Sequence, residues 1–524
     1  MNAHRPTCCL LILCLLGATP LGCGEDITEP SADARSAGPD ADQSAGDAGS
    51  SAPDAEVPVD LEQLVLDFEA GIVSRDQFRA AVARVEDPGW PTSLSQDFAA
   101  TTLLAARAEP YIVETDIAVL EGAILVIEEG TSLRLGPAVS MTVQGRLYAV
   151  GSQDSPIHIH GEPAQDYQQL RLESGPNQLV WTEFDRGIEN LVVAHPADTT
   201  TLVEQCRFDS WGLRALYQDA SQLRVAHSRF GMQTAENEIT GETFGSYNAG
   251  LTVLEDNDFG RMRGRGDILD LQLCQAGSWS VIAHNRFFGG EDDAIDLDRC
   301  NALVVGNTIR DFKPVDPGAM NAPSNGGGIT GDSGSMPVII NNLIDGCFHA
   351  IGFKNGARPI IINNTITNNN IGVTLYNTAP GVIMPTGVMI NNVLWNNLGW
   401  LDGGQDNDIV LNGKWWWSYN QVDDIQGNLE AMYNTLGSSP SSYPGDGNTS
   451  DDPLLDDIDG VPVPAANSPA IDSGASTISF TSLPIEQIPM EDVLQYLSRD
   501  YQGQPRERVG DTFPTIDRGA VERQ

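Results

Sequence analysis

A repeat constrains this 524-residue chain more than any other feature. A small polar residue recurs at intervals of 24, 22, 29, 28, 22, 35, 22 and 28 residues. A basal period of 22 with insertions of variable length is typical of a stacked solenoid, in which each coil contacts its neighbours. The repeated positions are Thr182, Cys206, Ser228, Asn257, Asn285, Asn307, Asn342, Asn364 and Asn392.

Short alternating segments with glycines at their ends accompany this repeat and predict strands separated by turns. Strands of successive coils would pair ~4.8 Å apart, and the repeated asparagines could bond to the next coil in a ladder. The repeat resembles that of bacterial right-handed parallel β-helix lipoproteins. The resemblance covers residues 110–400 and implies an all-β solenoid of about a dozen coils. Helical spacing in 61–95 predicts a small N-terminal helical segment, and residues 401–524 are expected to form a C-terminal cap over the last coil's strand edges.

The N-terminus predicts export. A short basic start precedes an apolar run from Cys8 to Ala18, which is typical of a signal peptide within residues 1–23. The segment from Pro20 to Cys23 resembles a bacterial lipoprotein cleavage box, which implies a lipid on Cys23; cleavage without lipidation is the alternative. Gly24, by the same resemblance, favours the outer membrane, facing the cell surface or the periplasm. Residues 24–60 hold almost no large apolar side chains and are expected to be a disordered linker.

The formal net charge of −43 excludes nucleic acid as a partner, because its binding needs many lysines and arginines. The same negative charge disfavours binding to anionic bilayer surfaces, so the lipid anchor is the expected contact with a membrane. The same charge permits divalent cations or a merely solvated acidic surface. The interpretation is a secreted protein, expected to be a monomer.

Aligning the strands of five coils gives two predicted outward rows and one inward row. The inward row is apolar: Leu269, Ile295, Ile329, Ile351 and Val373. The outward rows are Asp270, Asp296, Thr330, Gly352 and Thr374, and Gln272, Asp298, Asp332, Lys354 and Tyr376. Carboxylates this close repel one another unless they are neutralised, and Ca²⁺ prefers such oxygen ligands. The predicted metal ligands are Asp267, Asp270, Asp292, Asp293, Asp296 and Asp298; a solvated acidic face is the alternative.

The segment from Asp292 to Asp296 resembles the calcium site of family-nine pectate lyases, and Gly352 to Gly356 resembles the segment carrying their catalytic base. The resemblance implies calcium on Asp292, Asp293, Asp296 and either Asp267 or Asp270, with Lys354 as the base of a β-elimination. The 58 residues between Asp296 and Lys354 exceed the family's spacing. An Asp332–Lys354 ion pair is the alternative, and it would raise the lysine pKa, the wrong direction for a base.

Three further features leave alternatives open. The aromatic run Trp415, Trp416 and Trp417 could stack on sugars or plug the end of the solenoid. Cys274 and Cys300 occupy equivalent places on consecutive coils. They could form a disulfide or pack as two stacked small apolar side chains. His349, just before Lys354, is a second acid–base group or a structural residue.

The predicted function is therefore a surface-anchored β-helix lipoprotein that binds acidic polysaccharide through a calcium-loaded acidic face. One alternative is a calcium-dependent, pectate-like polysaccharide lyase acting by β-elimination. Another is a non-catalytic structural or adhesion protein.

Overall fold

The computed structural model describes residues 59–232, 241–264, 266–314, 326–376, 378, 381–383, 385–397, 409–411, 414–418, 421–422, 425–427, 448–475, 488–506 and 516–523. All of these belong to the second of two units, Pro58–Gln524. The predicted signal peptide, Cys23 and nearly all of the predicted linker lie outside the described residues. No helix in the described part of the chain is long and apolar enough to cross a membrane.

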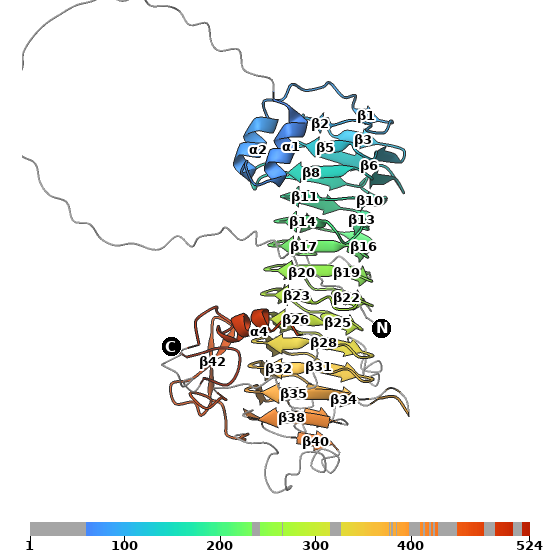
Figure 1. Cartoon of the computed structure of the whole chain (residues 1–524). Helices are drawn as coiled ribbons and strands as arrows, with labels where there is room; N and C mark the ends of the chain where they lie inside the picture. The colour runs from blue at the N-terminus through green and yellow to red at the C-terminus, as the bar shows by residue number, and fades with distance from the viewer. Residues whose placement is uncertain are drawn as a thin grey trace, which may run out of the picture. The chain divides into compact units, whose positions relative to one another are not determined.

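The described strands form a parallel β-solenoid with three long sheets of 14, 13 and 13 strands (Figure 1). Sheet A comprises β1 (Ser93–Leu94), β3 (Tyr111–Val113), β6 (Ser132–Leu135), β9 (Ile157–His160), β12 (Thr182–Asp185), β15 (Arg207–Phe208), β18 (Arg229–Phe230), β21 (Asp258–Phe259), β24 (Arg286–Phe287), β27 (Thr308–Arg310), β30 (Leu343–Asp345), β33 (Thr365–Thr367), β36 (Val393–Trp395) and β39 (Gln421–Val422). Sheet B comprises β4 (Ile117–Val119), β7 (Ser140–Val143), β10 (Tyr167–Leu172), β13 (Gly187–Val193), β16 (Trp211–Asp219), β19 (Glu242–Tyr247), β22 (Leu269–Gln272), β25 (Ile295–Asp298), β28 (Gly327–Asp332), β31 (His349–Lys354), β34 (Ile371–Tyr376), β37 (Ile409–Leu411) and β40 (Ile425–Gly427). Sheet C comprises β2 (Thr102–Leu104), β5 (Ile124–Ile127), β8 (Arg146–Val150), β11 (Asn177–Val180), β14 (Thr200–Glu204), β17 (Gln222–Ala226), β20 (Leu251–Glu255), β23 (Ser280–Ala283), β26 (Ala302–Val305), β29 (Val338–Ile340), β32 (Ile360–Ile362), β35 (Thr386–Ile390) and β38 (Lys414–Ser418). The solenoid is therefore longer than residues 110–400 at both ends, because strands before and after that range add to the same sheets.

The predicted ladder forms in the interior. Oδ1 of Asn307 accepts hydrogen bonds from the backbone N of Asn285 at 2.9 Å and from its Nδ2 at 3.1 Å. Nδ2 of Asn307 donates to the Ile282 carbonyl and to Oδ1 of Asn342, both at 2.9 Å. The same pattern joins Asn342, Asn364 and Asn392. Each buried amide thus satisfies polar groups of two neighbouring coils, which fixes the stacking register.

A column of phenylalanines fills the interior along sheet A. Rings of successive coils stack in parallel with centroids 4.7–4.9 Å apart. This distance is close to the spacing of paired strands, so each ring covers the next without a gap. The stacked residues are Phe184, Phe208, Phe230, Phe259 and Phe287.

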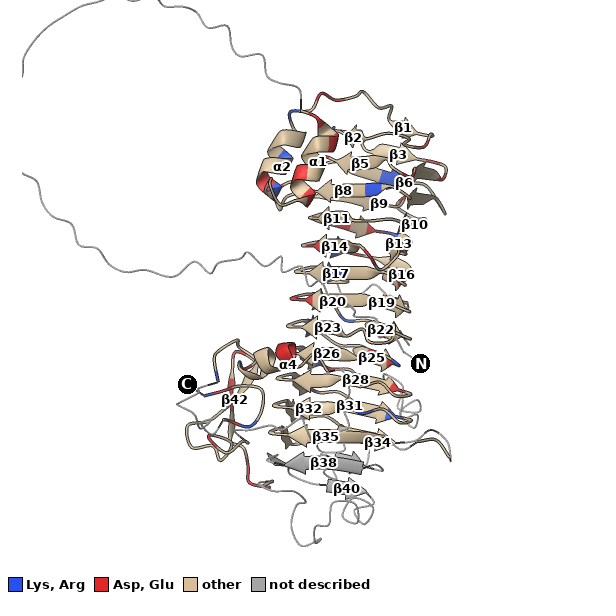
Figure 2. Cartoon of the chain, in the orientation of Figure 1, with Lys and Arg blue, Asp and Glu red and all other residues tan. Residues whose placement is uncertain are grey.

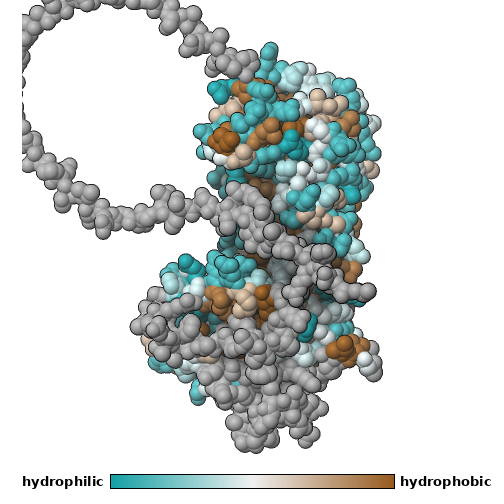
Figure 3. All heavy atoms as spheres, in the orientation of Figure 1, coloured by the Kyte–Doolittle hydropathy of each residue, from teal (hydrophilic) through white to brown (hydrophobic). Residues whose placement is uncertain are grey.

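Helices cover the outer face of sheet C. The predicted N-terminal helical segment forms α1 (Leu61–Glu69) and α2 (Arg75–Val82), which Asp60 and Ser74 cap at their N-termini. Their apolar sides pack with Tyr148 and other outward residues of sheet C. Further along the same face, Val493 of α4 (Met490–Leu497) packs on β26, β29 and β32. Figure 3 shows hydrophobic side chains gathered at both helical regions.

The described C-terminal residues pack on the side of the solenoid. Nδ2 of Asn341 donates to the Arg499 carbonyl at 2.7 Å, and the Ala520 backbone N donates to Thr365 Oγ1 at 2.9 Å. The antiparallel hairpin of β41 (Leu455–Ile458) and β42 (Val461–Pro464) lies against sheet A, where Val463 packs on Leu343. The described part of this segment covers a lateral face of the solenoid, whereas residues 428–447, 476–487 and 507–515 of the expected cap lie outside the described residues. The contact buries outward apolar residues of sheet C beneath α4 and Leu343 of sheet A beneath the hairpin.

Candidate functional site

The outer face of sheet B carries the predicted acidic rows. Asp270 of β22 pairs with Asp296 of β25, which pairs with Thr330 of β28, as the sequence predicts. The second row also holds, because Asp298 pairs with Asp332 and Lys354 pairs with Tyr376. The five inward residues of these coils are completely buried in the core. Figure 2 shows acidic residues at this edge of β25 and β28.

Five of the six predicted ligands converge. The carboxylates of Asp267, Asp292 and Asp293 place one oxygen each within 4.8 Å of one another, and so do those of Asp267, Asp270 and Asp296. Asp267 and the Asp292–Asp293 pair lie in the turns entering β22 and β25, so stacking of two coils assembles both groups. Asp298 belongs to neither group; it lies in the second row, beside Asp332.

Hydrogen bonds orient part of this acidic cluster and leave part of it open. Asp293 accepts from the Gly327 backbone N at 2.7 Å and from Thr330 Oγ1 at 2.8 Å. Asp270 Oδ2 accepts from Gln272 Nε2 at 2.7 Å, whereas its Oδ1 is buried without a partner among the described residues. A buried carboxylate oxygen without a donor costs free energy, which a cation would offset.

Burial raises the pKa of Asp270, Asp293 and Asp296 to about 7 each. The charges of neighbouring carboxylates contribute to these raised pKa values: chiefly Glu242 for Asp270, Asp292 for Asp293, and Asp293 for Asp296. Burial also raises the pKa of Asp267 well above its ordinary value. The cluster therefore favours any species that neutralises it, either protons or a hard cation with oxygen ligands. The donor set and the open oxygen of Asp270 fit Ca²⁺.

Lys354 lies two coils from Asp298 in the second row. Burial lowers its pKa, but the carboxylates of Asp296, Asp298, Asp332 and Asp293 raise it more, so the net pKa is raised. Among the described residues, Lys354 and Asp332 form no ion pair. Asp332 accepts a hydrogen bond from Asn355 Nδ2 at 3.1 Å instead. Asp296 and Asp298 raise the lysine pKa more than Asp332 does.

Two neighbours of Lys354 have contrasting environments. His349 is buried, and this burial lowers its pKa to about 4, so the ring is neutral and packs on Phe348 at 4.4 Å between centroids. This environment fits a structural histidine. Tyr376 is the next residue of the second row, and burial together with four aspartates raises its pKa above the ordinary value.

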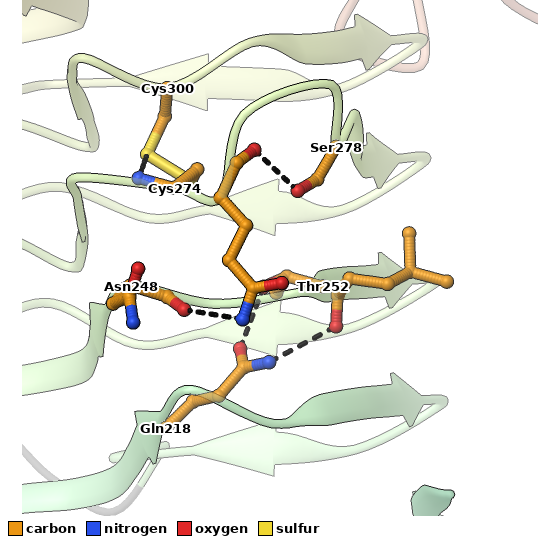
Figure 4. The surroundings of a disulfide bond; sticks show 8 residues. Gln218, Asn248, Thr252, Cys274, Ser278 and Cys300 are labelled. Carbon is orange, nitrogen blue, oxygen red and sulfur yellow. Dashed lines mark hydrogen bonds between the residues drawn. A yellow bond between two sulfur atoms is a disulfide. The ribbon is translucent and has the colours of Figure 1, made fainter. Parts of the chain in front are cut away.

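Cys274 and Cys300 form a disulfide with Cα atoms 4.9 Å apart (Figure 4). They follow β22 and β25 directly, so the bond joins the two coils that carry Asp270 and Asp296. The disulfide alternative of the sequence analysis is therefore the one observed. Cross-linking adjacent coils limits how far the two halves of the acidic cluster can separate.

Sequence reasoning missed two residues of the site. Thr330 was placed in the outward row, but its bonds to Asp293 and to Asp296 Oδ1, at 3.2 Å, were not foreseen. Glu242 of β19 was not considered; it forms an ion pair with Arg214 at 2.5 Å and acts on Asp270. Its strand pairs with β22, the strand of Asp270, and this position in the repeat could have indicated its role from the sequence. The side chains of Trp415, Trp416 and Trp417 lie outside the described residues, although their strand β38 pairs with β35.

Stacked coils, three parallel sheets and an asparagine ladder define the class of this protein, a right-handed parallel β-helix. In agreement, the family model described as the right handed beta helix region matches residues 280–413. The chain is also 38% identical over 55 residues to the protein bark beetle of Drosophila melanogaster, a match covering 10% of this chain and 2% of that protein.

Three solved structures are similar at low identity. The periplasmic alginate epimerase AlgG is 12% identical, with 66% of this chain and 78% of that chain covered and a TM-score of 0.36. The tailspike protein 3 of bacteriophage CBA120 is 11% identical, with 76% and 60% covered and a TM-score of 0.38. Pectate lyase Pel9A is 14% identical, with 78% and 89% covered and a TM-score of 0.27. At these values the likeness carries no inference about the activity of this chain.

Proposed function

We propose that this protein binds an acidic polysaccharide on the outer face of sheet B through Ca²⁺ held by the acidic cluster. The observation that carries the proposal is the convergence of two carboxylate groups that share Asp267, with Asp270 Oδ1 buried and unpaired among the described residues. Hard cations with six to eight oxygen ligands use donors of this kind. The proposed ligands are Asp267, Asp270, Asp292, Asp293 and Asp296.

Charge balance explains why such a face would accept a polyanion. Without cations, the cluster repels uronate carboxylates. Two divalent cations and the Lys354 ammonium together carry as much positive charge as the five carboxylates carry negative charge. A bound Ca²⁺ also accepts carboxylate oxygens from a ligand, because the protein groups need not fill its coordination sphere.

The proposal includes display outside the cell membrane. A lipid on Cys23 would hold the protein at the outer membrane, and residues 24–60 would act as a tether between lipid and solenoid. The disulfide between Cys274 and Cys300 supports an oxidising compartment, where such bonds persist.

Metal content and retention on immobilised polygalacturonate test this binding. We expect the purified protein to contain Ca²⁺, to be retained in its presence and to be released by a chelator. Asp296→Asn combined with Asp267→Asn should remove both the metal and the retention. Asp219→Asn is the matched control, since Asp219 lies in the second outward row above the cluster. Retention that a chelator leaves unchanged would contradict the proposal.

Lyase chemistry is the second candidate, favoured by the position of Lys354 facing the acidic cluster. Lys354 would remove the proton next to a uronate carboxylate, and the glycosidic oxygen would leave. The raised pKa of Lys354 in the cation-free site opposes this role. Bound cations would offset the carboxylates that cause it, so binding is the better-supported function and catalysis requires a separate test.

Ultraviolet absorbance of the unsaturated product, recorded with polygalacturonate and Ca²⁺, provides that test. Product from the wild type and none from Lys354→Ala would support a lyase, provided that the variant keeps its Ca²⁺. Equal product from both proteins, or none from the wild type, would remove the lyase assignment and leave the binding proposal standing.

A further inference from the structure

A pocket lies away from the acidic cluster, between the outer face of sheet A and the β41–β42 hairpin. Its volume is about 400 Å³. One wall belongs to the solenoid and the other to the hairpin, which Arg310 joins by donating from Nη2 to the Gly460 carbonyl. The pocket therefore exists only because the C-terminal segment folds back on the solenoid.

The floor of this pocket is a row of four outward residues on consecutive coils. Arg310 of β27 pairs with Asp345 of β30, Asp345 with Thr367 of β33, and Thr367 with Trp395 of β36. Three strand spacings separate the ends of the row, which makes the floor roughly 14 Å long. An elongated ligand of a few units could lie along it.

The floor carries three polar residues and, at one end, the aromatic Trp395. Trp395 is half-buried, with a large flat ring of the kind that packs against the apolar faces of sugars. Asp345 Oδ1 accepts from Asn368 Nδ2 at 2.6 Å and from Thr367 Oγ1 at 3.3 Å, which fixes the polar groups beside the ring. Nε of Arg310 is buried and has no partner among the described residues.

The opposite wall is rich in acceptors. Asp452, Asp456 and Asp457 line it, and all three are exposed at the rim. Asp456 lies 3.8 Å from Arg523, so its charge is partly compensated. Carboxylates accept hydrogen bonds from hydroxyl groups but repel other carboxylates. This wall therefore suits a neutral hydroxylated ligand and disfavours a uronate.

We propose that this pocket binds a short neutral oligosaccharide, with one ring stacked on Trp395 and its hydroxyls bonded to Asp345 and the hairpin aspartates. The site is distinct from the acidic cluster in both place and chemistry. It needs no cation, and its preference for uncharged sugars is opposite to that of the outer face of sheet B.

Isothermal titration of the full chain with cellotriose, maltotriose, trigalacturonate and tri-lysine tests the proposal. We expect a neutral trisaccharide to bind equally well with Ca²⁺ and with a chelator, and trigalacturonate in chelator to bind at least about tenfold more weakly. Trp395→Ala should weaken the neutral ligand about tenfold, whereas Trp395→Tyr should largely restore it. Phe288→Ala is the control, because Phe288 is 44% exposed and does not line the pocket.

Failure has definite signatures. The proposal is overturned if neither neutral trisaccharide binds at millimolar concentration, if tri-lysine binds more tightly than both, or if Trp395→Ala binds like the wild type. Circular dichroism of each variant shows whether the solenoid is intact, and chelator-sensitive retention on polygalacturonate reports independently on sheet B. A loss confined to the neutral sugar supports this pocket whatever the outcome there.

Discussion

Replacing Asn307 with alanine removes four hydrogen bonds from the interior of the solenoid. Two of them join Asn307 to Asn285, and the others join it to the Ile282 carbonyl and to Asn342. At a net value of roughly 1 kcal/mol for each buried bond, the free energy of unfolding should fall by about 4 kcal/mol. The groups left behind stay buried between coils, so water cannot readily replace the missing partner.

Guanidinium unfolding followed by circular dichroism measures this loss. Asn301→Ala is the control, because Asn301 lies half-exposed in a turn and its side chain makes no hydrogen bond with the described residues. The double variant Asn285→Ala/Asn307→Ala should lose less than the sum of the single variants, since either single variant already removes the bond from Nδ2 of Asn285 to Oδ1 of Asn307. A midpoint for Asn307→Ala equal to that of Asn301→Ala, or strict additivity of the pair, would refute the ladder as a source of stability.

Three further predictions concern the core, the disulfide and the C-terminal segment. Phe230→Ala should lower the free energy of unfolding by about 3–5 kcal/mol, because it opens a cavity in a continuous ring column; denaturant unfolding checks this, and a loss below 1 kcal/mol on the same scale would contradict it. Cys274→Ser with Cys300→Ser removes a cross-link between residues 26 apart, which should lower the free energy of unfolding by about 3.5 kcal/mol and weaken Ca²⁺ binding. Denaturant unfolding and calcium titration measure the two effects, and the reduced wild type should behave like the variant. Burial raises the pKa of Glu522 to about 7 from 4.5, so between these values the folded state holds a proton that the unfolded state has lost, and stability falls as the pH rises through this window. Glu522→Gln should remove that part of the slope, which unfolding at pH 5 and pH 8 checks; identical slopes would count against it.

The stacking register was predictable because it repeats. From Thr182 to Asn392 each coil places a small residue at the same bend and an apolar residue at the same inward position, so one alignment fixes these coils. That alignment brought Asp270 beside Asp296 correctly. It also located Asp267, Asp292 and Asp293 in turns that stack on each other.

Features without a period were not predictable. The contacts of Thr330 depend on which way one side chain turns. The bond from Asn341 to Arg499 joins residues 158 apart, and nothing in the local pattern of either one indicates the other. The position of the C-terminal segment, and with it the pocket at Trp395, follows from such contacts. The ion pair of Asp332 with Lys354, the alternative to a catalytic role for this lysine, is not among the ion pairs of the described residues. Register positions the Cα atoms, but the long lysine side chain can approach several carboxylates.

The docking of the C-terminal segment affects the order in which the parts of the molecule can fold. Arg506 donates to Asn341 at 3.1 Å and forms an ion pair with Glu522 at 2.7 Å, so these contacts join three stretches of chain at a coil that is translated much earlier. Coils can form one by one during synthesis, because each coil pairs with the one before it. The apolar outer faces of β26, β29 and β32 nevertheless remain exposed until Ile488 and the residues of α4 are synthesised, and until then they are accessible to chaperones or to other chains.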